Sequence, residues 1–169
     1  GHWAEASIER WSGYGIIQGS NGKFDPDGQL TCAQLATILA RLLKLPAAKD
    51  AGFIDNPADA WYYDAINRCA AAGILKGNGD GTVTPNASIT RERAMVMLAR
   101  ALGIEPLSRP DLSRYADAAH VSPYAQGYLA ALIEAGIVGG VTIRIIADGA
   151  DEEQAVDSLV ALVNSGFAE

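Results

Sequence analysis

Apolar residues recur along this chain of 169 residues at the spacing of amphipathic helices, in three pairs of segments. The first segments carry these apolar sets: Trp3, Ile8 and Trp11; Trp61, Ile66 and Cys69; Tyr124, Leu129 and Leu132. The second segments carry denser sets: Leu35, Ile38, Leu39 and Leu42; Ala94, Val96, Leu98 and Leu102; Val156, Leu159, Val160 and Val163. A period of about 3.6 residues predicts a helix in each segment, and so a mainly α fold of three helix–loop–helix repeats.

A glycine follows the first helix of each pair and aligns the three copies. These glycines are Gly15, Gly73 and Gly136, which are 58 and 63 residues apart. Glycine ends a helix readily because it has no Cβ to clash in the left-handed conformation. Turn-forming residues such as Asn78-Gly-Asp-Gly81 come next. The chain is therefore predicted to be a repeat protein.

Two segments rich in proline and polar residues, 45–53 and 104–112, separate the copies. We place the repeats at residues 1–47, 48–105 and 106–169. The first is expected to be clipped at its N-terminus, because it lacks the aromatic–x–Asp motif that opens the other two. A lone helix pair cannot bury two apolar faces, so the repeats are expected to form one compact domain, in a closed pseudo-threefold bundle.

Composition and charge exclude several classes of function. The chain is 49% hydrophobic, which excludes a disordered protein, and its net charge of −7 argues against general nucleic-acid binding. No apolar run reaches the roughly 20 residues that span a bilayer, so we expect no membrane insertion. The two cysteines, Cys32 and Cys69, make neither a disulfide framework nor a metal cluster. Cys69 is predicted to be a buried core residue, and no histidine near Cys32 in the sequence could activate it as a nucleophile.

The start of the second helix in the middle copy is the strongest candidate site. A helix N-terminus carries unpaired N–H groups and a partial positive charge, which suit a carboxylate. Thr90 can cap this helix, and Arg91 adds a forked, permanently charged donor. In the other copies, Thr31 with Gln34 and Asp151 with Gln154 fit capping boxes, so capping explains them as well as binding does.

The ordered motifs Phe-x-Asp, Trp, Ile-x-x-Trp/Cys-x-x-x-Gly-Ile, Asp-Gly-Thr-Val-x-Pro-Asn and Ile-Thr-Arg-Glu resemble the S-layer homology (SLH) repeat. The likeness covers nearly the whole chain and is strongest in the second copy. It implies three repeats in a three-pronged spindle whose grooves bind secondary cell-wall polysaccharide, often carrying pyruvate ketals. It also implies an extracellular protein at the bacterial cell wall, held there non-covalently, with no enzymatic activity and no cofactor.

In this family the second helix usually begins Thr-Arg-Ala-Glu, and this segment faces the ligand. Arg91 matches the family arginine, whereas Arg93 replaces the glutamate. The resemblance pairs each helix start with the leading aromatic residue of the next repeat, so Arg91 is grouped with Gly77 and Tyr124, and Cys32 with Gly19 and Trp61. Stacking on a sugar and packing in the core both explain the aromatic residues, and the core interpretation is preferred for Trp3, Trp11 and Trp61. The candidate ligand-binding residues are Thr31, Gln34, Trp61, Gly77, Thr90, Arg91, Arg93 and Tyr124.

Residues 142–169 depart from the repeat and resemble the last strand and helix of the phosphocarrier protein HPr. The run Thr-Ile-Arg-Ile-Ile at 142–146 favours a short strand. The phospho-accepting histidine segment of that family has no counterpart, because His2 and His120 lie in other contexts. We therefore expect no phosphotransfer, and the segment is either a drifted repeat or a graft.

Three other interpretations compete with glycan binding. A calcium loop starting at Asn78 would need a bidentate carboxylate at its twelfth position, which is Ile89. An enzyme would need a nucleophile–base set or converging carboxylates, and neither is evident. A scaffold of degenerate repeats whose grooves bind nothing is the main alternative, since two of the three helix starts lack the arginine.

Overall fold

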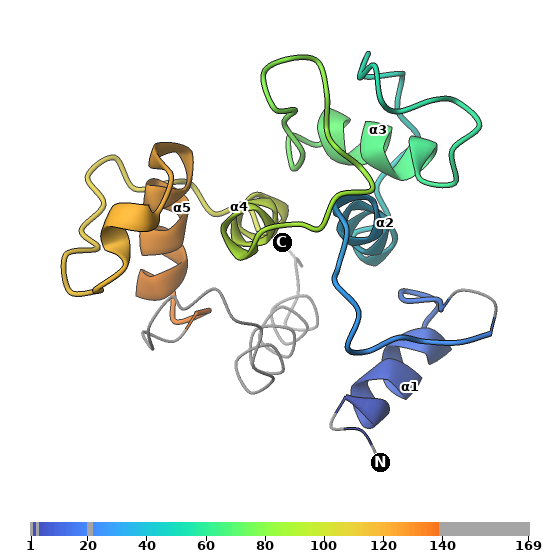
Figure 1. Ribbon diagram of the computed structural model, residues 1–169, viewed down its shortest axis with the longest axis horizontal. Helices are drawn as coiled ribbons and strands as arrows, with labels where there is room; N and C mark the ends of the chain where they lie inside the picture. Colours follow the sequence, from blue (N-terminus) through green and yellow to red (C-terminus); the bar gives the residue numbers. More distant parts are fainter. Residues whose placement is uncertain (1, 3, 20–21, 139–169) are drawn as a thin grey trace, which may run out of the picture. The chain divides into compact units, whose positions relative to one another are not determined.

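The computed structural model describes residues 2, 4–19 and 22–138. Its elements are α1 (Glu5–Gly13), α2 (Cys32–Leu42), α3 (Tyr63–Ala71), α4 (Arg91–Ala101), the 3-10 helix η1 (Ala118–His120) and α5 (Pro123–Glu134) (Figure 1). Within those residues there is no β-strand, and an isolated antiparallel bridge joins Thr31 and Ser88. The mainly α prediction is confirmed. The strand predicted at 142–146 and the last predicted helix lie outside the described residues.

The chain divides into two compact units, unit 1 (Gly1–Ile89) and unit 2 (Thr90–Glu169). Within unit 1, α2 packs against α3, and within unit 2, α4 packs against α5. The second helix of one copy thus packs on the first helix of the next copy. The repeat boundaries 1–47, 48–105 and 106–169, their assembly into one domain and the pseudo-threefold arrangement stay predictions.

Glycine ends the first helix of each copy, as the pattern predicted. Gly15, Gly73 and Gly136 have φ angles of +71°, +73° and +69°. A side chain would strain the backbone in this left-handed region, so only glycine turns the chain here at low cost. The prediction that a glycine ends each of these three helices is confirmed.

The core of unit 1 joins α2, α3 and the loop after α3. Its fully buried side chains include Leu39, Ile66, Cys69 and Val83. Asp55, from the Phe-Ile-Asp motif, holds this loop in place. Its carboxylate accepts hydrogen bonds from the backbone N–H of Val83 (3.0 and 3.2 Å) and of Thr84 (2.7 Å). The motif therefore anchors a loop 28 to 29 residues ahead, which is about half a repeat.

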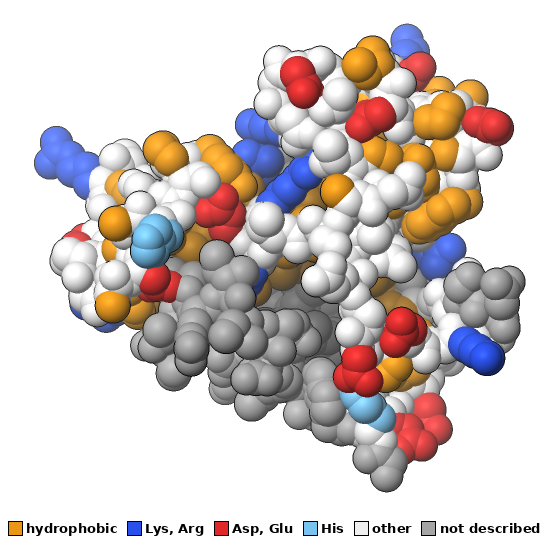
Figure 2. Space-filling model, viewed as in Figure 1, with side chains coloured by type: hydrophobic (Ala, Val, Ile, Leu, Met, Phe, Trp, Pro, Cys, Tyr) orange, Lys and Arg blue, Asp and Glu red, His pale blue; other side chains and the backbone are white. Residues whose placement is uncertain are grey.

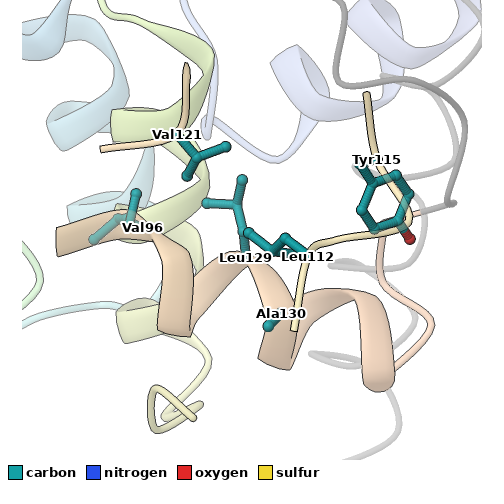
Figure 3. Close-up of a cluster of buried hydrophobic side chains, with 7 residues drawn as sticks. Val96, Leu112, Tyr115, Val121, Leu129 and Ala130 are labelled. Carbon is teal, nitrogen blue, oxygen red and sulfur yellow. The ribbon is translucent and has the colours of Figure 1, made fainter. Parts of the chain in front are cut away.

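The core of unit 2 forms between α4, α5 and the segment that connects them (Figure 3). Its buried members are Val96, Leu112, Tyr115, Val121, Ala125, Leu129 and Ala130. Gly127 lets the connecting segment lie close to α5, because a Cβ there would stand 2.8 Å from the Leu107 carbonyl oxygen. In return, the Leu107 N–H donates to the Gly127 carbonyl at 3.1 Å. This packing holds the connecting segment against α5.

Candidate functional site

The start of α4 is a capped helix N-terminus with two arginines in its first turn. Thr90 has extended backbone angles, and its hydroxyl accepts a hydrogen bond from the Arg93 N–H at 3.3 Å. Arg91 and Arg93 are half-buried. A guanidinium keeps its charge at every physiological pH and matches a carboxylate with two parallel donors. This turn therefore has the chemistry of an anion site.

Glu92, which the sequence did not single out, connects this turn to α5. Its carboxylate accepts from the Ser122 hydroxyl (2.6 Å), the Ser122 N–H (3.0 Å) and the Tyr124 hydroxyl (3.1 Å). Ser122 is the N-cap of α5 and makes no side-chain cap; its hydroxyl and N–H donate to Glu92 instead, which places a negative charge at the start of α5. Partial burial acts to raise the pKa of Glu92, but the hydrogen bonds from Ser122 and Tyr124 outweigh it and the pKa is lowered.

Tyr124 has a half-exposed aromatic ring next to this turn. Its side chain is 52% exposed although its hydroxyl is held by Glu92. Burial and the charge of Glu92 raise the pKa of Tyr124 to about 12, while Arg93 and Arg100 act to lower it. The phenol therefore stays neutral, and its exposed face can stack on a sugar ring. Unit 2 thus holds four predicted residues: Thr90, Arg91 and Arg93 at the start of α4, and Tyr124, which is bonded to Glu92 of the same helical turn.

Gly77 lies in unit 1, where packing alone explains why this position is a glycine. A Cβ at this position would stand 2.7 Å from the Phe53 ring and 2.9 Å from the Thr82 carbonyl oxygen. Phe53 and the 78–82 turn therefore need a glycine here whether or not a ligand binds. The predicted sugar contact at Gly77 stays a prediction.

The start of α2 is a closed capping box. The Thr31 hydroxyl accepts from the Gln34 N–H at 3.2 Å, and the Thr31 N–H donates to the Gln34 side-chain oxygen at 2.8 Å. The capping interpretation of these two residues is confirmed, while a binding role for them stays a prediction. Cys32, at the position of Arg91, is buried. The Asp151–Gln154 box lies outside the described residues.

Trp61 corrects an expectation from the sequence. Its side chain is 64% exposed, so the core interpretation is wrong for this residue. The neighbouring Tyr62 is buried in its place, and the two rings meet edge to face with centroids 5.3 Å apart. Helix α3 begins only at Tyr63, so the helical period does not reach back to Trp61. Trp11 is half-buried, and Trp3 lies outside the described residues.

Metal-ligand clusters and membrane-spanning helices are both absent from the described part of the chain. None of its His, Cys, Asp and Glu side chains form a group of three or more that could hold a metal ion. No described helix is both long and apolar enough to cross a membrane. Figure 2 shows acidic side chains on the surfaces of both units, in keeping with the net charge of −7. An anionic ligand would therefore depend on local groups such as those at the start of α4.

Two families match the chain. The S-layer homology domain matches residues 1–36 and 55–92. The PTS HPr component phosphorylation site matches residues 124–165, and this stretch contains no histidine. Both resemblances seen in the sequence are confirmed, and the HPr match begins earlier than residue 142, inside α5.

The curated relatives are bacterial surface and wall proteins and several polysaccharide-degrading enzymes. The surface-layer 125 kDa protein of Lysinibacillus sphaericus is 37% identical over 139 residues, which are 82% of this chain and 12% of that protein. The S-layer protein sap of Bacillus anthracis is 36% identical over 107 residues, 62% of this chain and 13% of that protein. The amylopullulanase of Thermoanaerobacterium thermosulfurigenes is 28% identical over 151 residues, 86% of this chain and 8% of that protein. The chain therefore spans about a tenth of the length of these relatives.

Proposed function

Because residues 1–36 and 55–92 match the S-layer homology domain, we propose that this chain anchors a bacterial surface protein by binding an acidic, pyruvylated secondary cell-wall polysaccharide. The family and the surface-layer and wall relatives support anchoring at the cell surface. The polysaccharide and the site are our proposal. We place the site at the start of α4, with Thr90, Arg91, Arg93 and Tyr124 as its residues.

The observation that carries the proposal is that unit 2 has arginines at the start of α4 and the exposed ring of Tyr124 at the start of α5. The α4 N-terminus and the arginines favour a carboxylate such as that of a pyruvate ketal. The half-exposed ring of Tyr124 offers the apolar face that a sugar ring stacks on. The Glu92 carboxylate accepts three hydrogen bonds from Ser122 and Tyr124, so it orients the ring and ties the start of α4 to the start of α5.

The same role accounts for the mixture of relatives. Surface-layer proteins and enzymes named amylopullulanase and endoglucanase share this segment over a small part of their lengths. An anchoring module serves both kinds of protein, with any catalytic activity carried elsewhere in the enzymes. We therefore propose a non-catalytic role for this chain.

The test is calorimetric titration of the purified chain with pyruvylated wall polysaccharide, beside Arg91→Ala and the exposed-arginine control Arg109→Ala. We expect Arg91→Ala to weaken binding by about 10- to 100-fold, the range for losing a charged hydrogen-bond donor. Arg109→Ala should bind as the parent does, and removal of the pyruvate groups should abolish binding.

Two results would contradict the proposal. Unchanged binding by a folded Arg91→Ala variant would move the site away from α4. Absence of binding by the folded parent chain would favour the alternative, a scaffold whose repeats bind no glycan. The start of α2 is the observation in favour of that alternative. Thr31 and Gln34 close a capping box there, and Cys32 stands at the position of Arg91, so this helix start has no charged donor.

A further inference from the structure

The turn that follows α3 contains an asparagine followed directly by a glycine. Asn78 and Gly79 lie in the loop that leads from α3 to α4 (Figure 1), and both residues are exposed. Gly79 has a φ angle of +92°, in the region that favours glycine. Within the described residues, the Gly79 N–H donates no hydrogen bond. The backbone nitrogen next to the Asn78 side chain is therefore accessible and has no competing partner there.

The other three asparagines among the described residues lack this combination. Asn56 and Asn67 are buried. Asn86 is exposed, but the N–H of the residue after it donates to the Thr84 carbonyl oxygen at 3.1 Å. That residue is an alanine, whose Cβ also restricts the approach of the nitrogen. Asn86 is therefore a matched comparison for Asn78.

We propose that Asn78 is a site of spontaneous deamidation, which converts it to aspartate or isoaspartate and destabilises the turn after α3. The electrophile is the side-chain amide of Asn78, and the nucleophile is the backbone nitrogen of Gly79. The only other reactant is water. This inference does not depend on glycan binding.

The reaction has two steps. The Gly79 nitrogen attacks Cγ of Asn78, so a nitrogen–carbon bond forms and closes a succinimide ring. The bond between Cγ and Nδ2 breaks, and Nδ2 leaves as ammonia with the proton from the Gly79 N–H. Water then adds to one of the two ring carbonyl carbons and breaks its bond to the ring nitrogen. Opening at Cγ gives aspartate, whereas opening at the main-chain carbonyl gives isoaspartate.

The hydrogen bonds of the turn show why this product matters. The Asn78 amide donates to the Thr82 hydroxyl at 2.9 Å, and that hydroxyl donates to the Asp80 carboxylate at 2.6 Å. A carboxylate at position 78 has no proton to donate, and the single hydroxyl proton cannot serve two carboxylates. The two negative charges therefore repel each other within one small turn. Isoaspartate also lengthens the main chain by one carbon.

The intact turn is bonded to the segment that opens the second copy. The Asn78 N–H donates to the Thr82 carbonyl oxygen at 2.8 Å, and the Ile54 N–H donates to the Gly81 carbonyl oxygen at 3.0 Å. Val83, directly after the turn, is buried in the core of unit 1. Deamidation should therefore lower the stability of unit 1, and each conversion changes the net charge from −7 to −8.

The test is to incubate the purified chain in mildly alkaline buffer and to digest samples with trypsin at intervals. Cleavage after Lys76 and Arg91 gives one peptide, 77–91, that contains both Asn78 and Asn86. We expect this peptide to gain the mass difference between an amide and an acid, as two products that separate by reversed-phase chromatography. Fragmentation should place the change at Asn78, with no detectable change at Asn86.

Two variants separate the chemistry from its effect on stability. Asn78→Gln keeps the amide on a longer side chain, which closes a ring much more slowly, so this variant should stay unmodified. Asn78→Asp installs the aspartate product, and its Tm should be lower than that of the parent by about 5 °C. Melting is followed by tryptophan fluorescence, because all three tryptophans lie in unit 1 together with the turn.

The assignment of the site is overturned if Asn78 stays intact during the incubation, or if Asn78 and Asn86 change at the same rate. The effect on the turn is overturned if Asn78→Asp melts at the same temperature as the fresh parent chain. A fall in the Tm of the incubated parent that Asn78→Gln shows equally would also contradict the proposal, since the loss would then arise elsewhere.

Discussion

The starts of α2 and α4 occupy the same place in the repeat but differ in what they offer a ligand. At α2, the side chain of Gln34 closes a reciprocal cap with Thr31. At α4, the position of Gln34 is taken by Arg93, and the Thr90 hydroxyl caps only the Arg93 N–H. One helix start closes its cap with a neutral glutamine side chain, while the other carries two arginines in its first turn.

The residue that follows each threonine sharpens this contrast. Cys32 is buried in the core of unit 1, whereas Arg91 is half-buried. A charged residue is tolerated only where its head group reaches water or a partner. Packing in unit 1 therefore requires a small, uncharged residue at position 32. This explains why the first copy lacks the arginine, and the same replacement removes a charged donor from the helix start.

Exchanging these two residues should give the largest effect. Cys32→Arg forces a long charged side chain into a filled core, so we expect unit 1 to lose about 3–5 kcal/mol. Arg91→Cys at the matching place should cost less than about 1 kcal/mol, as is usual for a position outside the core. Urea unfolding followed by tryptophan fluorescence measures the first variant, and circular dichroism measures the second. Equal losses in the two variants would mean that burial does not distinguish these helix starts.

Removing the caps should give an intermediate effect. Thr31→Ala loses the hydroxyl of a two-way capping box, and we expect a cost of about 1–2 kcal/mol in urea unfolding. Thr90→Ala loses a single bond of 3.3 Å and should cost about 1 kcal/mol or less. Thr31→Ser and Thr90→Ser keep the hydroxyl and serve as matched controls. A larger loss at Thr90 than at Thr31 would contradict the view that α2 has the more complete cap.

Local features of the fold could be predicted from the sequence. Helical spacing identified the buried faces that include Ile66, Cys69 and Leu129, and the glycines marked the helix ends. These features depend on residues within one or two turns of each other, which a pattern records directly. Trp61 was assigned wrongly because α3 starts after it, and the ends of an element depend on capping and tertiary contacts.

The sequence did not reveal the role of Glu92, because its hydrogen-bond partners are far away in the sequence. Glu92 bonds to Ser122 and Tyr124, which are 30 and 32 residues away. No spacing rule connects such positions, since their meeting depends on how α4 packs against α5. An acidic residue in the first turn of α4 was the available signal, and it indicated only a favourable helix dipole.

The pH dependence of unit 2 should give the smallest effect, and it tests the role of Glu92. The folded-state pKa of Glu92 is lowered, so its stabilising contribution is complete above the unfolded pKa of about 4.3 and is lost as the pH falls through the folded value. The stability gap between the parent chain and Glu92→Gln should therefore be widest at neutral pH and close below about pH 4. Urea unfolding followed by circular dichroism at several pH values measures this gap. Asp80 and Asp111 also have lowered pKa values, but both proteins contain them and their contributions cancel in the difference. A gap that stays constant into acid would mean that the charge of Glu92 does not hold α4 against the start of α5.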